Sequence, residues 1–316
     1  MISVRGWRPL ASAAAAVTLL ATAAAAPSEP VTTRQAVDVE AVIDVGGVPS
    51  GIVATADGIW VATGPGGIVR IEPRTNSVTV RIRPGGAVIG LAAGFGDLWA
   101  IDAVGNRLLR IDPRQRRVSA VLPVGPMPTG LAVGCGRVWV VSQLGSTVVG
   151  IDPRTSRVQA ARRFTYGELW PGGVATGPDG VWLVTGQGTE VTRLDGGTAA
   201  VESTFRVPGA RTLAATRHSV WVGRSGDRPL ARIEQDGLHF VPFARGHGAN
   251  GRGPALVAGR SVWVADRGRL AAYDPAGTNE LALPLPTSGH VGAVAVAGDV
   301  WLADESAGAV VRVRAR

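Results

Sequence analysis

Residues 90–114, GLAAGFGDLWAIDAVGNRLLRIDPR, and residues 130–154, GLAVGCGRVWVVSQLGSTVVGIDPR, are two copies of one pattern. In each copy an apolar segment leads into a Gly-containing turn, a second apolar segment carries a Trp, and a third ends at Asp-Pro. Gly, Asn and Asp accept the backbone conformations of tight turns, whereas Pro cannot donate to a sheet ladder and ends a strand. The pattern therefore predicts short antiparallel strands joined by tight turns.

The Trp of this pattern recurs along the whole chain at intervals of 38–43 residues, at Trp60, Trp99, Trp139, Trp182, Trp221, Trp263 and Trp301. A fourth apolar segment follows the Asp-Pro or Glu-Pro, as in residues 77–82 and 117–122. Four short strands per repeat at this period are typical of a β-propeller. We therefore predict an all-β, seven-bladed β-propeller in which the large Trp rings pack between neighbouring blades.

The two ends of the repeat region predict how the ring closes. Residues 39–45, VEAVIDV, precede the first repeat and have the pattern of an isolated fourth strand. The last repeat stops at residues 310–314, VVRVR, which correspond to its third strand. We expect the N-terminal strand to complete the last blade, which would also cover an exposed sheet edge.

The first residues of the chain indicate export. Arg5 and Arg8 are followed by an apolar stretch and a run of small residues, as in a secretory signal. We expect a signal peptide over residues 1–26, a linker over 27–37 and the propeller over 38–316, in a secreted or periplasmic protein. The apolar stretch is short and Ala-rich for a membrane span, although an uncleaved anchor is the alternative interpretation.

Charge and cysteine content limit the possible partners. The formal net charge is +8 and every basic residue is Arg, which permits binding to nucleic acid, anionic lipid or acidic glycans. Cys135 is the single cysteine, so no intramolecular disulfide can form. A core of this size does not need one.

Two sets of residues should lie at one end of the blades, around the ring axis, which we call the channel face. One set is the loops that lead into each first strand. The other is the residues three positions after each periodic Trp: Thr63, Asp102, Ser142, Thr185, Arg224, Asp266 and Asp304. We expect ligand contacts from Asp102, Arg224, Arg252 and Trp170. Trp170 lies off the period, in the insertion FTYGELWP at residues 164–171.

The sixth and seventh blades carry the candidate chemistry. His247 and His290 precede or open these blades, and Asp266, Asp304 and Glu305 end their second strands. If these side chains face one another, the two His could act as acid–base catalysts and the three carboxylates could bind a divalent cation such as Mg²⁺. The alternative is that they are polar loop residues bonded to water and backbone. Metalloprotease, nucleophile-elbow and Walker motifs are absent from the sequence.

Repeats of the form Pro-x-Gly-Ile-Ala, Asp-Gly-x-Trp-Val-Ala and Val-x-Arg-Ile-Asp-Pro resemble those of the YVTN and NHL propellers. They are also similar to the streptogramin (virginiamycin B) lyase group. The lyase resemblance implies a magnesium-dependent ring opening of a cyclic depsipeptide by elimination, with His290 at the start of a first strand. Asp304 stands where that family carries Glu, three residues after Trp301.

Three functions follow, and whether the chain is an enzyme stays open. The first is a monomeric binding protein that holds a small molecule or a protein partner at its channel face. The second is a lyase of the virginiamycin B type, or a lactone hydrolase, acting through His290, His247, Asp304 and Asp266 with Mg²⁺. The third is polyanion or nucleic-acid binding, for which aromatic platforms are few. Its candidate residues are Arg211, Arg224, Arg228, Arg252, Arg267 and Arg269.

Overall fold

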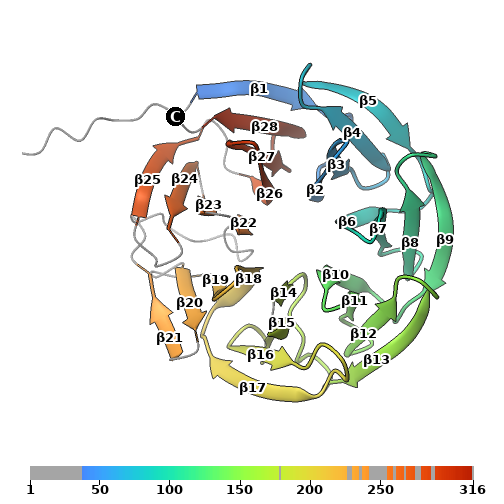
Figure 1. Ribbon diagram of the computed structural model, residues 1–316, viewed down its shortest axis with the longest axis vertical. Coiled ribbons are helices and arrows are strands. Elements are labelled where there is room, and N and C mark those ends of the chain that lie inside the picture. Colours follow the sequence, from blue (N-terminus) through green and yellow to red (C-terminus); the bar gives the residue numbers. More distant parts are fainter. Residues whose placement is uncertain are drawn as a thin grey trace, which may run out of the picture. The chain divides into compact units, whose positions relative to one another are not determined.

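The repeats fold as sheets arranged around a ring axis (Figure 1). The computed structural model describes residues 38–177, 179–225, 230–234, 237–241, 255–258, 261–266, 268–274, 279–285 and 289–314. The chain divides into two units, Met1–Arg34 and Gln35–Arg316, and all described residues belong to the second. In these residues 28 strands form seven four-stranded antiparallel sheets. The described part of the chain contains no helix that is long and apolar enough to cross a membrane.

Blades 1 to 6 each take four consecutive strands, and their order in each sheet is their order in the chain. Blade 1 has β2 (Gly51–Thr55), β3 (Gly58–Ala62), β4 (Ile68–Glu72) and β5 (Ser77–Ile82). Blade 2 has β6 (Val88–Gly94), β7 (Asp97–Asp102), β8 (Arg107–Asp112) and β9 (Arg117–Pro123). Blade 3 has β10 (Pro128–Gly134), β11 (Arg137–Ser142), β12 (Thr147–Asp152) and β13 (Arg157–Arg163).

The remaining blades follow in the same direction around the ring. Blade 4 has β14 (Val174–Gly177), β15 (Gly180–Thr185), β16 (Glu190–Leu194) and β17 (Val201–Arg206). Blade 5 has β18 (Ala210–Ala215), β19 (Val220–Arg224), β20 (Leu230–Glu234) and β21 (Gly237–Phe240). Blade 6 has β22 (Ala255–Ala258), β23 (Val262–Asp266), β24 (Arg269–Tyr273) and β25 (Asn279–Pro284). Blade 7 has β26 (His290–Val296), β27 (Asp299–Asp304), β28 (Ala309–Arg314) and β1 (Asp38–Asp44).

The predicted closing strand is confirmed. β1 pairs antiparallel with β28, from Asp38 opposite Arg314 to Asp44 opposite Ala309 (Figure 1). β1 has one extra, unpaired residue between the partners of Arg312 and of the residue after it. In the β4–β5 ladder of blade 1, β5 has one extra residue between the partners of Arg70 and of the residue after it. β1 therefore has the register of a fourth strand, although it is supplied by the other end of the chain.

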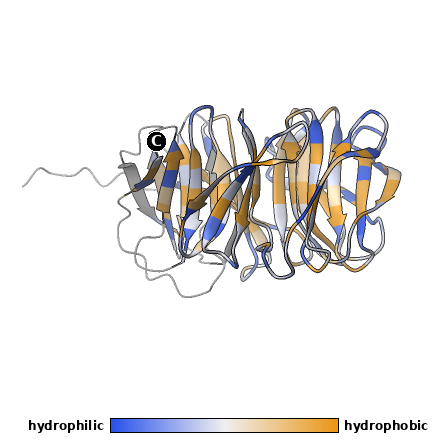
Figure 2. Ribbon diagram, turned by 90° about the horizontal axis from the view of Figure 1, so that it is seen from below, coloured by the Kyte–Doolittle hydropathy of each residue, from blue (hydrophilic) through white to orange (hydrophobic). Residues whose placement is uncertain are grey.

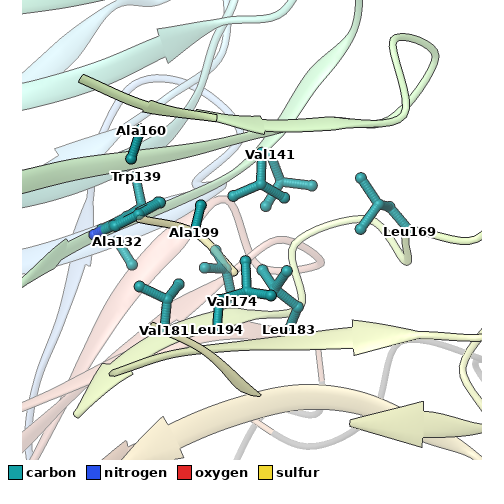
Figure 3. Close-up of a cluster of buried hydrophobic side chains, with 11 residues drawn as sticks. Ala132, Trp139, Val141, Ala160, Leu169, Val174, Val181, Leu183, Leu194 and Ala199 are labelled. Atoms are coloured by element: carbon teal, nitrogen blue, oxygen red, sulfur yellow. The ribbon is translucent and has the colours of Figure 1, made fainter. Parts of the chain in front are cut away.

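The apolar core lies between blades. The buried hydrophobic residues of the described chain form seven clusters, each drawn from two neighbouring blades. Figure 3 shows the cluster of blades 3 and 4, where Trp139 of blade 3 and Val181 of blade 4 face the same interior. Figure 2 shows the blades edge-on, with hydrophobic segments along the strands and loops at both ends. Each blade therefore depends on its two neighbours for burial.

The periodic Trp residues fill these junctions, as predicted. Trp60, Trp99, Trp139, Trp221 and Trp301 are at most 1% exposed, and Trp182 is 6% exposed. An Arg of the third strand stands opposite the Trp in five blades, as Trp60–Arg70, Trp99–Arg110, Trp182–Arg193, Trp221–Arg232 and Trp301–Arg312. In four of these pairs the guanidinium lies over the ring, 4.8–5.9 Å from its centroid. Such a stack adds cation–π attraction to the buried area.

Some of these guanidinium groups also bind the next blade. Arg110 donates from Nη1 to the Pro153 carbonyl of blade 3 at 2.8 Å. Arg312 donates from Nη1 to the Pro73 carbonyl of blade 1 at 2.6 Å and pairs through Nε with Asp299 at 2.7 Å. Asp299 is only 5% exposed. Arg312 therefore links the last blade to the first, where the two ends of the repeat region meet.

In blade 3 a different residue makes the link. Gly150 stands opposite Trp139, and a Cβ at this position would lie 2.9 Å from the indole ring. Arg137, on the same strand as Trp139, instead donates from Nη1 to the Gly196 carbonyl of blade 4 at 2.5 Å. The junction keeps its bridging guanidinium, although the Arg comes from another position of the repeat.

The Arg312 bridge yields a stability prediction. Replacing Arg312 by Met keeps the apolar stem but leaves the buried Asp299 carboxylate without its closest partner. Loss of one member of a buried pair is strongly destabilising, so we expect the free energy of unfolding to fall by about 3 kcal/mol. Chemical denaturation monitored by Trp fluorescence measures this change.

The matched control is Arg83→Met, at an exposed Arg, which should change the stability by less than about 0.5 kcal/mol. Equal effects of the two substitutions would contradict a special role for Arg312 in ring closure.

Candidate functional site

The two sets of loops expected at the channel face do lie at one end of the blades. Backbone hydrogen bonds join the loop before a first strand to the residue after the second strand of the same blade. Gln143 donates to the Met127 carbonyl at 2.9 Å, Ser225 to Gly209 at 2.8 Å, and Glu305 to Gly289 at 2.9 Å. The turns within the hairpins of first and second strands lie at the opposite end, which we call the turn face.

The polar residues that follow each Trp by three positions are mostly buried. Thr63, Asp102, Ser142, Thr185 and Asp304 are at most 1% exposed. Asp102 accepts hydrogen bonds from the backbone N–H of Ala87 at 3.1 Å and of Gly105 at 3.0 Å, and from Arg107 Nε at 3.0 Å. Its carboxylate thus fastens two loops of the channel face to each other. Ligand binding by Asp102 stays a prediction.

Burial and hydrogen bonding act in opposite directions on Asp102. Burial alone would raise the pKa of this carboxyl group. Hydrogen bonds from Arg107, Gly105 and Ala87 favour the charged form, and with the nearby positive charge of Arg107 they outweigh burial, so the pKa of Asp102 is lowered from its ordinary value.

In blade 7 Asp304 has a similar position. Its Oδ2 accepts from the N–H of Gly289 at 3.1 Å, and its Oδ1 accepts from Ser306 Oγ at 2.6 Å and the N–H of Ala307 at 2.8 Å. His290 stands opposite Asp304 in the β26–β27 ladder, and the structure does not describe its side chain. Both oxygens of Asp304 thus already hold loop donors, which is the arrangement of a loop anchor.

The other predicted residues of this sector are placed in part. Asp266 ends β23 opposite Arg269 and is partly exposed, as is Glu305. His247 and Arg252 lie outside the described residues, as do Arg228 and Arg267. Among the residues that are described, no three His, Cys, Asp or Glu lie together in a way that could hold a metal ion. Catalysis by His290 and His247 and magnesium binding by Asp304, Asp266 and Glu305 stay predictions.

Trp170 lies against an Arg of the next blade. The Arg211 guanidinium is 4.0 Å from the centroid of the partly buried Trp170 ring, and its Nη1 donates to the Ala210 carbonyl at 2.7 Å. A Cβ at Gly188, where φ is +86°, would lie 2.2 Å from Arg211 Nη1, so the guanidinium needs a glycine at this position. Burial lowers the pKa of Arg211. Blades 4 and 5 therefore hold a positioned Trp–Arg pair at the channel face.

Arg224 is anchored in the same sector. Its Nε and Nη2 both donate to the Pro208 carbonyl, at 2.9 and 2.7 Å, and its guanidinium lies 4.8 Å from the centroid of the Phe240 ring. Arg224 therefore supports the loop that leads into blade 5. A direct contact of Arg224 or Trp170 with a ligand stays a prediction.

A set of exposed apolar side chains on the channel face was missed by sequence reasoning. Five large apolar residues in the channel-face loops of blades 1 to 4 are 42–77% exposed, and we call them the channel-face crescent: Val48, Val104, Met127, Leu144 and Tyr166. Each occurs in a loop rich in Gly, Ser, Asn or Pro. An apolar residue in such a loop is the sequence signal that could have found them.

Hydrogen bonds between blades hold the crescent loops together. Asn106, in the Val104 loop, accepts from the N–H of Met127 at 2.8 Å through its side chain and from the N–H of Val124 at 3.1 Å through its carbonyl. Phe164, beside Tyr166, donates to the Ser146 carbonyl of the Leu144 loop at 2.8 Å. In blades 2 to 4 the crescent is therefore displayed on interlinked loops.

Asp102 gives a pH-dependent prediction. A carboxyl group whose pKa is lowered by folding stabilises the protein above its unfolded pKa of about 3.9, and this contribution is lost as the pH falls through the folded pKa. We expect Asp102→Asn to lower the free energy of unfolding by about 1–2 kcal/mol at neutral pH, and by progressively less below about pH 4. Urea denaturation across this pH range measures it.

The control for this prediction is Asp112→Asn in the turn between the third and fourth strands of the same blade. Asp112 accepts backbone N–H bonds from Arg114 and Gln115, a role that Asn also fills, so its effect should be small at every pH. A deficit of the Asp102 variant that is constant down to acidic pH would contradict the assignment.

Comparison with solved structures finds this fold in proteins of different kinds. No protein-family model matches the sequence, and no curated protein matches it. A streptogramin B lyase structure matches with a TM-score of 0.72 at 16% identity, covering 87% of this chain and 97% of that one. A chain of a mitotic checkpoint complex gives 0.73 at 14%, covering 95% and 98%. BamB from Moraxella catarrhalis gives 0.60 at 11%, covering 85% and 84%. The chain is a seven-bladed β-propeller, similar in architecture to the streptogramin B lyase.

Proposed function

We propose that this chain is an exported binding protein that docks a protein partner on the channel-face crescent. The observation that carries the proposal is the exposure of Val48, Val104, Met127, Leu144 and Tyr166 on one face. Exposed apolar side chains that gather on one surface mark interaction sites in soluble proteins.

The two faces of the propeller differ in this respect. Phe95 is the one large apolar residue of the described turn-face loops that is exposed to a comparable degree, at 49%. The remaining exposed examples lie on the outer strands. The asymmetry favours the channel face as the binding surface, because packing of the fold itself would not concentrate exposed apolar side chains at one end of the blades.

The crescent ends beside residues that suit the centre of an interface. Tyr166, which is 76% exposed, lies on the same inserted segment as Trp170, and Trp170 is stacked on Arg211. Tyr, Trp and Arg are the residue types that contribute most at protein interfaces. Loops that are already linked by hydrogen bonds lose little freedom on binding, which favours affinity.

Export belongs to the proposal because residues 1–26 have the pattern of a secretory signal. The lyase-like function with Mg²⁺ is the second candidate, supported by the position of His290 opposite Asp304 and by the fold of the streptogramin B lyase. We rank it second because the Asp304 carboxylate already holds three loop donors.

The test uses the immobilised protein and the extracytoplasmic protein fraction of the organism that encodes it. Leu144→Asp combined with Tyr166→Ser removes two crescent contacts without touching the core. We expect partner capture, measured by quantitative mass spectrometry, to fall at least about tenfold, as for loss of central interface residues.

Phe95→Ser on the turn face is the matched control and should capture the same partner as the unchanged protein. Equal melting temperatures would establish that both variants are folded. A partner captured equally by the crescent variant, or lost only with Phe95→Ser, would contradict docking on the channel face.

A further inference from the structure

A groove on the turn face lies between blades 4 and 5, away from the crescent. Its volume is about 260 Å³, and its lining includes Asp179, Trp182, Arg193, Phe205, His218 and Glu234. The Trp182 and Phe205 rings are 5.9 Å apart. A space of this size is smaller than a typical drug-sized site and suits a small ligand or one side chain.

The groove coincides with a change in the repeated Arg–Asp pair. In blades 1 and 2 the third-strand Arg contacts the Asp of the hairpin turn, with Arg70 3.5 Å from Asp57 and Arg110 2.6 Å from Asp97. In blade 4 Arg193 pairs instead with Glu202 on the outer strand at 3.0 Å. The exposed turn carboxylate of this blade, Asp179, has no cationic partner among the described residues.

A sequence difference between blades 1 and 4 accompanies this change in pairing. In blade 1 Thr55 lies five residues before the Trp, donates a hydrogen bond to Asp57 Oδ1 and accepts one from the indole of Trp60. In blade 4 the same position is Gly177, which has no hydroxyl group. Asp179 therefore lacks the neighbour that holds its counterpart in blade 1.

Trp182 supplies a hydrogen-bond donor at the groove. In blades 2 and 3 the indole N–H donates at 3.2 Å to the carbonyl five residues earlier, that of Gly94 or Gly134. In blade 4 that carbonyl, Gly177, faces the Cys135 thiol at 3.5 Å. Trp182 is only 6% exposed, and within the described chain its Nε1–H has no acceptor. Trp182 lines the groove, so this N–H can donate to an acceptor that a ligand brings.

The charges around the groove favour a cation. Arg193 is paired with Glu202, and Arg232 is paired with Glu234 at 3.1 Å, which leaves Asp179 as the unbalanced charge. At the junctions after blades 2 and 7, a guanidinium of the protein itself reaches from an indole ring to the next blade. In blade 4 Arg193 pairs with the outer strand of its own blade. The groove lies in the place that the bridging guanidinium takes at those other junctions.

We propose that this groove binds arginine, as the free amino acid or as a residue of a peptide. The guanidinium would pair with Asp179 beside the aromatic walls, and the ligand's carbonyl or carboxylate oxygen would accept from Trp182 Nε1–H. This site lies on the opposite face from the crescent and goes beyond the proposed docking function.

The test is calorimetry with free arginine and with Nα-acetyl-arginine amide, which represents a peptide residue. Citrulline and its blocked form have the same shape without the charge. We expect saturable binding of at least one arginine probe, and binding about tenfold weaker for its citrulline counterpart and for Asp179→Asn.

Asp57→Asn, at the matching turn position of blade 1, is the control and should bind as the unchanged protein does. The crescent variant Leu144→Asp/Tyr166→Ser should also bind arginine normally, so that failure of the docking proposal can be distinguished from failure of this one. Binding of the blocked probe alone would identify a peptide as the source, and binding of free arginine alone would identify the amino acid.

Two results would overturn the proposal. One is the absence of saturable binding by both arginine probes. The other is equal binding by the arginine and citrulline forms or by Asp179→Asn, because the charge pair would then contribute nothing.

Discussion

Burial between neighbouring blades is the constraint on which the rest of this structure depends. A four-stranded blade cannot cover its own apolar faces, so each of the seven clusters is shared by two blades. The Trp rings are the largest fully buried side chains of these clusters, and guanidinium groups such as Arg110 and Arg312 add hydrogen bonds to the following blade. Because a ring has no free end, the junction between blades 7 and 1 must satisfy the same requirement. β1 and Arg312 do so there.

Because this constraint acts on the strands, the loops can differ in sequence between blades. The differences are of one kind at the channel face and of another at the turn face. At the channel face, buried Asp102 fastens the loop that exposes Val104, and buried Asp304 fastens loops of blade 7. At the turn face, the third-strand Arg of blades 1 and 2 pairs with an Asp of the hairpin turn. In blade 4 Arg193 pairs with Glu202 instead of Asp179, and the groove lies there. The two proposed binding surfaces therefore lie where the repeat is interrupted or its loops carry unusual residues.

The repeat predicted the architecture because its signals are local. The Trp period, the Gly-containing turns and the isolated strand at residues 39–45 can each be recognised from residues that are close together in the sequence. Side-chain direction at the channel face was harder to predict, because Asp102 and Asp304 turn toward loop N–H groups whose positions depend on the folded blade. The groove depends on the ion pair between Arg193 and Glu202, which joins residues on different strands. A repeat alignment sets Asp179 against Asp57 of blade 1, but it could not have placed the partner of Arg193.

Hydroxyl-radical footprinting of the protein, alone and after incubation with the extracytoplasmic fraction, tests the central claim most directly. Met127 and Tyr166 on the crescent and Phe95 on the turn face are all oxidisable and exposed, so one digest reports on both faces. We expect bound partner to lower the oxidation of Met127 and Tyr166 and to leave that of Phe95 unchanged. Protection of Phe95 with unchanged oxidation of Met127 and Tyr166 would contradict it.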